Sequence, residues 1–111
     1  MTTNNLLTSL RVKQADFKEV LQHIDNMYVY TASAFTNGSQ NNAENENQGS
    51  ARVLFFAKLN NLSKEDTLEL FAEHYASVLN TPEGTDHQNI RQFQLHGWEA
   101  VSFEKDVLTL K

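Results

Sequence analysis

Cysteine is absent from this chain of 111 residues, and proline and glycine are scarce, with one and four residues respectively. Without cysteine there can be no disulfide, no thiolate nucleophile and no cysteine-ligated zinc site. The four glycines never form a Gly-x-Gly arrangement, so a glycine-rich phosphate-binding loop is also excluded. A chain of this length is typical of one domain, and we expect a single domain over residues 1–111.

Basic residues are outnumbered by acidic ones, nine against 14, which gives a formal net charge of −5. Because nucleic-acid binding relies on lysine and arginine against phosphates, we expect no nucleic-acid partner. No apolar run approaches the ~20 residues that cross a bilayer, and the first residues resemble no signal peptide. We therefore expect no membrane partner, and an intracellular location is compatible with the absence of cysteine.

Apolar residues at helical spacing predict about five helices. The clearest case has Phe17, Val20, Leu21 and Ile24 at i, i+3, i+4 and i+7. Helices are expected near residues 6–10, 14–26, 63–79 (with Ser63 as N-cap) and 86–96. For residues 51–60 periodicity leaves helix and strand open, and the absence of β-branched residues after Val53 favours a helix capped by Ser50.

Two segments favour strands. Residues 27–36 (MYVYTASAFT) are rich in aromatic and β-branched side chains, and Val101 and Phe103 alternate with polar neighbours. We expect them to pair as a small two-stranded antiparallel sheet with the helices packed over it, a mainly helical α+β fold. The polar segment 37–50 (NGSQNNAENENQGS) is expected to be an exposed, mobile loop.

The segment after the fourth helix carries turn and capping signals. Residues 81–84 (TPEG) predict a type I turn, and residues 85–88 (TDHQ) have the form of a capping box, in which Thr85 and Gln88 would begin a helix. Gly97 is expected to end that helix in a left-handed conformation, with Trp98 packed on Phe93.

Several stretches together resemble the HopJ type III effector family. They include residues 34–38 (AFTNG), 47–50 (NQGS), 56–59 (FAKL) and, most specifically, 82–91 (PEGTDHQNIR). The resemblance implies a protein of the bacterial cytoplasm, or one secreted by a type III system, and it brings no established reaction or cofactor. Family members tend to carry a cysteine where this chain has Ala51.

The polar groups of residues 85–91 are the first candidate site. One interpretation is a small-ligand or anion site at a helix start, and the other, which capping chemistry favours, is a purely structural helix start. We expect no cofactor and no metal site, because Glu69, Glu73 and His74 lack the spacing of a helical metal motif and fit a solvated face. The candidate binding residues are Asn37, Gly38, Lys58, Thr85, Asp86, His87, Asn89 and Arg91.

Because no convergent catalytic motif is visible, we expect a protein that binds rather than catalyses. The expected partner is an unknown protein or a small ligand, met by residues 37–50 and 82–91 together. The alternative is a small cytoplasmic enzyme or metabolite-binding protein with a pocket near His87 and Arg91.

Overall fold

The computed structural model describes residues 3–12 and 15–111, and within these ranges it contains six α-helices, a short 3-10 helix and two small antiparallel sheets. This confirms the predicted mainly helical α+β class. No helix in the described part of the chain has the length and apolar character that crossing a membrane requires. The helices are α1 (Thr3–Arg11), α2 (Phe17–Met27), α3 (Gln48–Leu59), α4 (Lys64–Glu69), α5 (Glu73–Asn80), α6 (Gln88–His96) and η1 (Gly97–Ala100).

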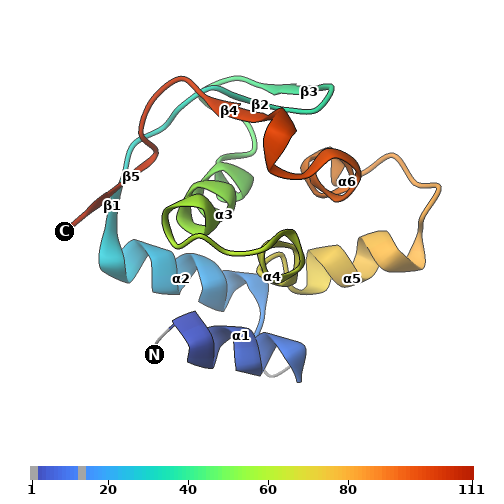
Figure 1. Ribbon diagram of the computed structural model, residues 1–111, viewed down its shortest axis with the longest axis horizontal. Helices are drawn as coiled ribbons and strands as arrows, with labels where there is room; N and C mark the ends of the chain where they lie inside the picture. The colour runs from blue at the N-terminus through green and yellow to red at the C-terminus, as the bar shows by residue number, and fades with distance from the viewer. Residues whose placement is uncertain (1–2, 13–14) are drawn as a thin grey trace.

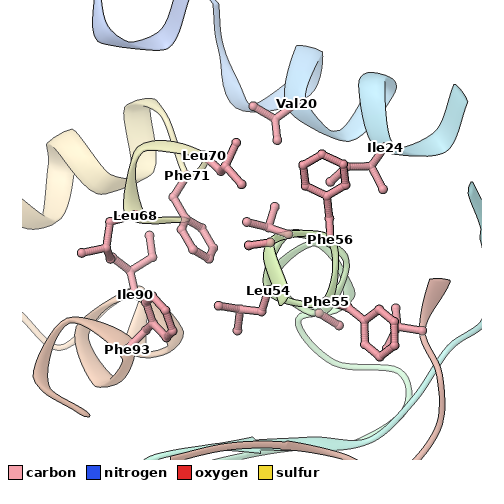
Figure 2. Close-up of a cluster of buried hydrophobic side chains, with 14 of the residues drawn as sticks. Val20, Ile24, Leu54, Phe55, Phe56, Leu68, Leu70, Phe71, Ile90 and Phe93 are labelled. Carbon is pink, nitrogen blue, oxygen red and sulfur yellow. The ribbon is translucent and has the colours of Figure 1, made fainter. Parts of the chain in front are cut away.

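The centre of the molecule is α3, with α2 on one side, the three-stranded sheet on the opposite side, and α4 and α6 beside it (Figure 1). Its consecutive residues 53–57 are all buried, so the middle of α3 is apolar around its whole circumference, as a helix segment enclosed by others must be. Leu54, Phe55 and Phe56 leave α3 in different directions (Figure 2), and Phe56 points toward Val20 and Ile24 of α2. Residues 51–60 thus lie mainly in a helix, but its N-cap is Asn47 and not Ser50.

The predicted single sheet is two sheets. Strands β1 (Tyr28–Tyr30) and β5 (Leu108–Leu110) form one pair, and β3 (Gln40–Asn42), β2 (Phe35–Asn37) and β4 (Val101–Phe103) form the other sheet. Residues 101–103 therefore pair, as predicted, with segment 27–36, but only with its end, which belongs to β2. The start of the segment forms β1 and pairs with β5, and the residues between Tyr30 and Phe35 are not in a strand. The second half of the chain also supplies β5, which no pattern predicted.

The helix predicted over residues 63–79 is interrupted at Leu70–Ala72. Its start is as expected, because the Asp66 amide donates to the Ser63 hydroxyl over 3.1 Å. Leu68, Leu70 and Phe71 are all buried and converge on the core (Figure 2). A continuous helix would rotate Leu70 away from the face that carries Leu68 and Phe71, so the chain breaks there instead.

The break depends on an unusual backbone conformation at Ala72, where φ is 51° and ψ is −123°. A residue with a Cβ is strained there, at a cost of about 1–3 kcal/mol. The conformation starts α5 in a new direction, which places His74 and Glu73 near the beginning of α2.

We expect Ala72→Gly to stabilise the protein by about 1 kcal/mol, because relief of strain outweighs the greater flexibility of glycine in the unfolded chain. Urea unfolding followed by circular dichroism measures the difference. The matched control is Ala76→Gly inside α5, where glycine should cost about 1 kcal/mol. Destabilisation of similar size by both variants would contradict the strain at Ala72.

His23 is a buried polar residue of the core, 7% exposed, and its Nε2 atom has no hydrogen-bond partner among the described residues. Its ring meets Phe56 edge-on, with ring centroids 5.8 Å apart. Burial penalises the imidazolium form, so the pKa of His23 is lowered from its ordinary value.

The unfolded chain consequently takes up a proton at His23 at a higher pH than the folded chain does. We expect the free energy of unfolding to fall as the pH drops from about 6.5 toward the lowered pKa of the folded state. In His23→Leu this part of the pH dependence should disappear, whereas His96→Leu, at an exposed position, should retain it. Urea titrations at a series of pH values measure this, and identical profiles for His23→Leu and the unsubstituted protein would contradict it.

Candidate binding pocket

A pocket with a volume of about 280 Å³ opens where the first residues of four helices meet. Phe17 begins α2, Gly49 and Ser50 lie in the first turn of α3, His74 is in the first turn of α5, and Gln88 begins α6. Because a helix start presents the positive end of the helix dipole, the starts of α3 and α6 favour ligand groups with negative charge, whereas the start of α2 already has the carboxylates of Asp16 and Glu73. The lining residues are Phe17, Asn47, Gly49, Ser50, Phe71, His74, His87, Gln88, Asn89 and Ile90.

Two histidines are the chemically versatile groups of the pocket. The rings of His74 and His87 lie 5.0 Å apart between centroids, with their planes inclined by 38°. Nothing in the described chain forms a hydrogen bond with either imidazole, and His87 has only the Asp86 carboxylate at 3.9 Å. The ring nitrogens are therefore available to donate to, or accept from, a bound group.

The floor of the pocket is aromatic, and a hydrogen bond to Glu73, which does not line the pocket, fixes its position. Phe17 stacks on the buried Phe71, with centroids 6.1 Å apart and planes inclined by 10°, and it meets His74 edge-on at 4.8 Å. The backbone amide of Phe17 donates to Glu73 Oε1 over 2.7 Å, so Glu73 anchors the start of α2. The start of α3 packs against this floor, since a Cβ at Gly49 would lie in van der Waals contact with the Phe17 ring, at 3.4 Å.

Metal-binding side chains do not gather at this point. Within residues 3–12 and 15–111 no three histidine, aspartate or glutamate side chains are placed to hold one metal ion. What the pocket offers is a set of hydrogen-bonding groups over an apolar floor, the arrangement typical of a binding site for a small group.

The helices α3 and α6 both begin without a side-chain cap. Asn47 and His87 precede α3 and α6 in the left-handed conformation, each with φ of 51°, and neither makes a side-chain capping bond. The first-turn amides of these two helices consequently have no capping side chain as acceptor. The capping box predicted at residues 85–88 is wrong, because α6 begins only at Gln88, and the side chain of Gln88 donates from Nε2 to the Thr85 carbonyl over 2.8 Å.

Segment 37–50 is the exposed loop that its composition predicts only over residues 43–47. It contains β3 and the first turn of α3, and Asn37 and Asn42 are buried. Asn42 and Asn89 form a reciprocal amide pair, with Asn89 Nδ2 donating over 2.9 Å and Asn42 Nδ2 over 3.2 Å. Asn37 Nδ2 donates to the Asn89 carbonyl over 2.7 Å.

This asparagine network ties the β2–β3 hairpin to the start of α6. It also reaches the rim of the pocket, because Asn47 Nδ2 donates to Asn42 Oδ1 over 2.8 Å. The prediction placed Asn37 and Asn89 at a binding surface. The structure buries both within the fold, where Asn37 Nδ2 and the Asn89 amide are hydrogen-bonded, Asn37 Oδ1 has no partner among the described residues, and Asn89 also lines the pocket.

Arg91 does not line the pocket with His87, although the two residues were predicted to lie at one site. Arg91 is buried, with 8% of its surface exposed. Its guanidinium donates from Nη1 to the Thr81 carbonyl over 2.7 Å. Nη2 donates to Asp86 Oδ1 over 2.7 Å, and this bond lowers the pKa of the Asp86 carboxyl. Arg91 thereby closes the loop 81–86, whose first turn is confirmed by the 2.9 Å bond from the Gly84 amide to the Thr81 carbonyl.

The remaining predicted residues lie apart from the pocket. Thr85 is exposed in the loop, and Gly38 turns the β2–β3 hairpin with φ of 60°, next to Gln92. Lys58 is exposed at the end of α3, with its ammonium 5.9 Å from the Phe103 ring. Ala51 is fully buried, so a cysteine in its place would lie in the core and not in the pocket.

Of the residues that line the pocket, His87 and Asn89 were predicted from the sequence as binding residues, whereas His74 and Phe17 were not. The sequence placed His74 on a solvated helix face and Phe17 on the buried face of another helix. Their contact could not be predicted, because it depends on the break at Ala72. The signal was available in Leu70, whose burial cannot be accommodated on the same helical face as Leu68 and Phe71.

Comparison with known proteins agrees with the resemblance in the sequence. The family model described as HopJ type III effector protein matches residues 3–108. A solved structure titled "Crystal structure of unknown function protein VPA0580" is 41% identical, with a TM-score of 0.90, over 100% of this chain and 95% of that one. Among curated proteins, none matches.

We expect Arg91→Lys to cost about 2–3 kcal/mol of stability, because a lysine ammonium cannot replace the forked contacts of a nearly buried guanidinium. Urea unfolding measures the loss. Arg11→Lys is the matched control, since Arg11 pairs with Asp66 at the surface and the change should cost less than about 1 kcal/mol. Equal small losses in both variants would show that Arg91 does not hold the loop.

Proposed function

The chain belongs to the HopJ type III effector family, and we propose that it acts by binding a partner protein through the pocket between α3 and α6. The two segments expected to form the binding surface both contribute to this pocket, segment 37–50 through Asn47, Gly49 and Ser50, and segment 82–91 through residues 87–90. The partner would insert one side chain into it.

The observation that carries the proposal is the pair of unengaged imidazoles above an apolar floor. His74 and His87 supply hydrogen-bond donors, and the uncapped starts of α3 and α6 add amide groups and positive dipole ends. These features together favour an acceptor with negative charge, and the carboxylate of aspartate or glutamate is the protein group that fits.

Binding is favoured over catalysis by what surrounds the histidines. Ser50 is the hydroxyl of the pocket, and in the described residues no hydrogen bond connects it with His74 or His87. A nucleophile and its general base normally lie within hydrogen-bonding reach of each other. The imidazoles are therefore better placed to recognise a group than to activate a nucleophile.

The name of the family supports a further element of the proposal, namely delivery of the protein by a type III secretion system. On this basis the partner would be a host protein. Retention in the bacterial cytoplasm is the alternative, with a bacterial protein as partner.

A metabolite-binding protein is the second candidate. The volume of about 280 Å³ lies near the lower end of the range for small-molecule sites. A free metabolite that carries a carboxylate would meet the same groups as a glutamate side chain. Arg91 would take no part, because its donors are used within loop 81–86.

A thermal-melt screen with small carboxylates and inorganic phosphate tests the pocket chemistry. A ligand at a hundred times its Kd should add about 2.7 kcal/mol, which for this size of domain raises Tm by roughly 10 °C. We expect the shift to be lost in His87→Ala and in His74→Gln and to persist in His96→Ala, where the histidine is exposed on the last turn of α6.

The same variants decide between the two candidates. If the screen is flat, the unsubstituted protein should still capture a partner from host or bacterial lysate, and His87→Ala should not. A shift for one free carboxylate instead supports the metabolite-binding protein. Shifts or capture that survive both histidine substitutions would show that the pocket is not the binding site.

A further inference from the structure

A groove of about 470 Å³ lies on the other side of Glu73 and shares no lining residue with the pocket. It runs between the end of α1, the beginning of α2 and the length of α5. Its apolar surface consists of Leu10, Ala15, Ala72, Tyr75, Ala76 and Leu79.

The groove exists because α5 presents apolar side chains that no other element covers. Tyr75 and Ala76 precede Leu79 by four and three residues along α5, so all three lie on the same side of the helix. Only Val78 of this helix is fully buried, whereas Leu79 is 54% exposed. Figure 1 shows α5 extending well past the end of α1.

The rim of the groove is acidic. Asp16, Glu69 and Glu73 line it, and Arg11, the one basic residue in the described lining, is already paired with Asp66 at 2.5 Å. Burial raises the pKa of the Tyr75 hydroxyl, and the negative charges of Glu69 on the rim and of Glu65 outside it raise it further. An apolar floor with a negative rim selects an amphipathic partner of positive charge.

We propose that this groove docks an amphipathic helical segment of a partner protein, with apolar side chains against Tyr75, Ala76 and Leu79 and with lysine or arginine opposite Glu69 and Glu73. The eight residues of α5 span about 12 Å, which matches two turns of a docked helix. A second copy of this chain is a poor occupant, because its net charge of −5 would repel the acidic rim. The proposal is independent of the pocket between α3 and α6.

The test uses two synthetic 14-residue helical peptides as probes, one with leucine on one face and lysine on the other, and the same peptide with glutamate in place of lysine. Binding to the full chain is measured by calorimetry and mapped by amide chemical shifts. We expect the lysine peptide to bind at least ten-fold more tightly than the glutamate peptide and to shift resonances of α5 and of the α1–α2 junction.

Substitutions then separate the groove from general charge attraction. Leu79→Lys places a positive charge on the exposed floor of the groove and should lower the affinity for the lysine peptide at least ten-fold. Leu95→Lys, the same change at a 71% exposed position on α6, should leave its affinity unchanged. Since both leucines are exposed, both variants should melt within a few degrees of the unsubstituted protein.

Three results would overturn the proposal: equal affinity of the two peptides, shifts that lie outside the groove, or equal weakening by Leu79→Lys and Leu95→Lys. Because the pocket is tested with carboxylates and with histidine variants, failure of the groove leaves the pocket untouched, and the reverse also holds.

Discussion

The burial of α3 on every side is the constraint on which the rest of the structure depends. A 12-residue helix with consecutive buried residues from Val53 to Ala57 cannot be covered by one neighbour, so the other elements must surround it. Phe56 faces α2, Leu54 faces the side of α6, and Phe55 packs edge-on against Phe103 of β4 (Figure 2). Short strands and short helices suffice because each covers only a part of α3.

Surrounding one helix in this way also explains why functional groups gather at helix starts. The chain must turn sharply to reach each new side of α3, and two of those turns place Asn47 and His87 in the left-handed conformation just before α3 and α6. The break at Ala72 does the same for α5 with a strained backbone. Strained backbone often lies at functional sites, and here three such residues directly precede helices that line one pocket.

Sequence patterns predicted the helices and the fold class well, because amphipathic periodicity reports which face is buried. They failed where tertiary contacts override local preference. Segment 37–50 has the composition of an exposed loop, yet Asn42 finds a partner in Asn89, 47 residues away, and is buried. Residues 63–79 follow helical spacing, yet Leu70 must also be buried. Of the candidate site, His87 was found and His74 was missed for this second reason.

Arg91 and His87 show why residues that are close in sequence need not share a role. Both belong to the most family-specific stretch, 82–91, and a ligand site there would naturally use both. In the structure Arg91 donates its hydrogen bonds to Thr81 and Asp86 within the loop. The loop closed in this way places the His87 ring beside that of His74. The stretch therefore combines one residue that holds the loop with one that faces the pocket. A histidine carried on a loop closed in this way can recognise a ligand with little loss of conformational freedom, because its backbone is already held in place.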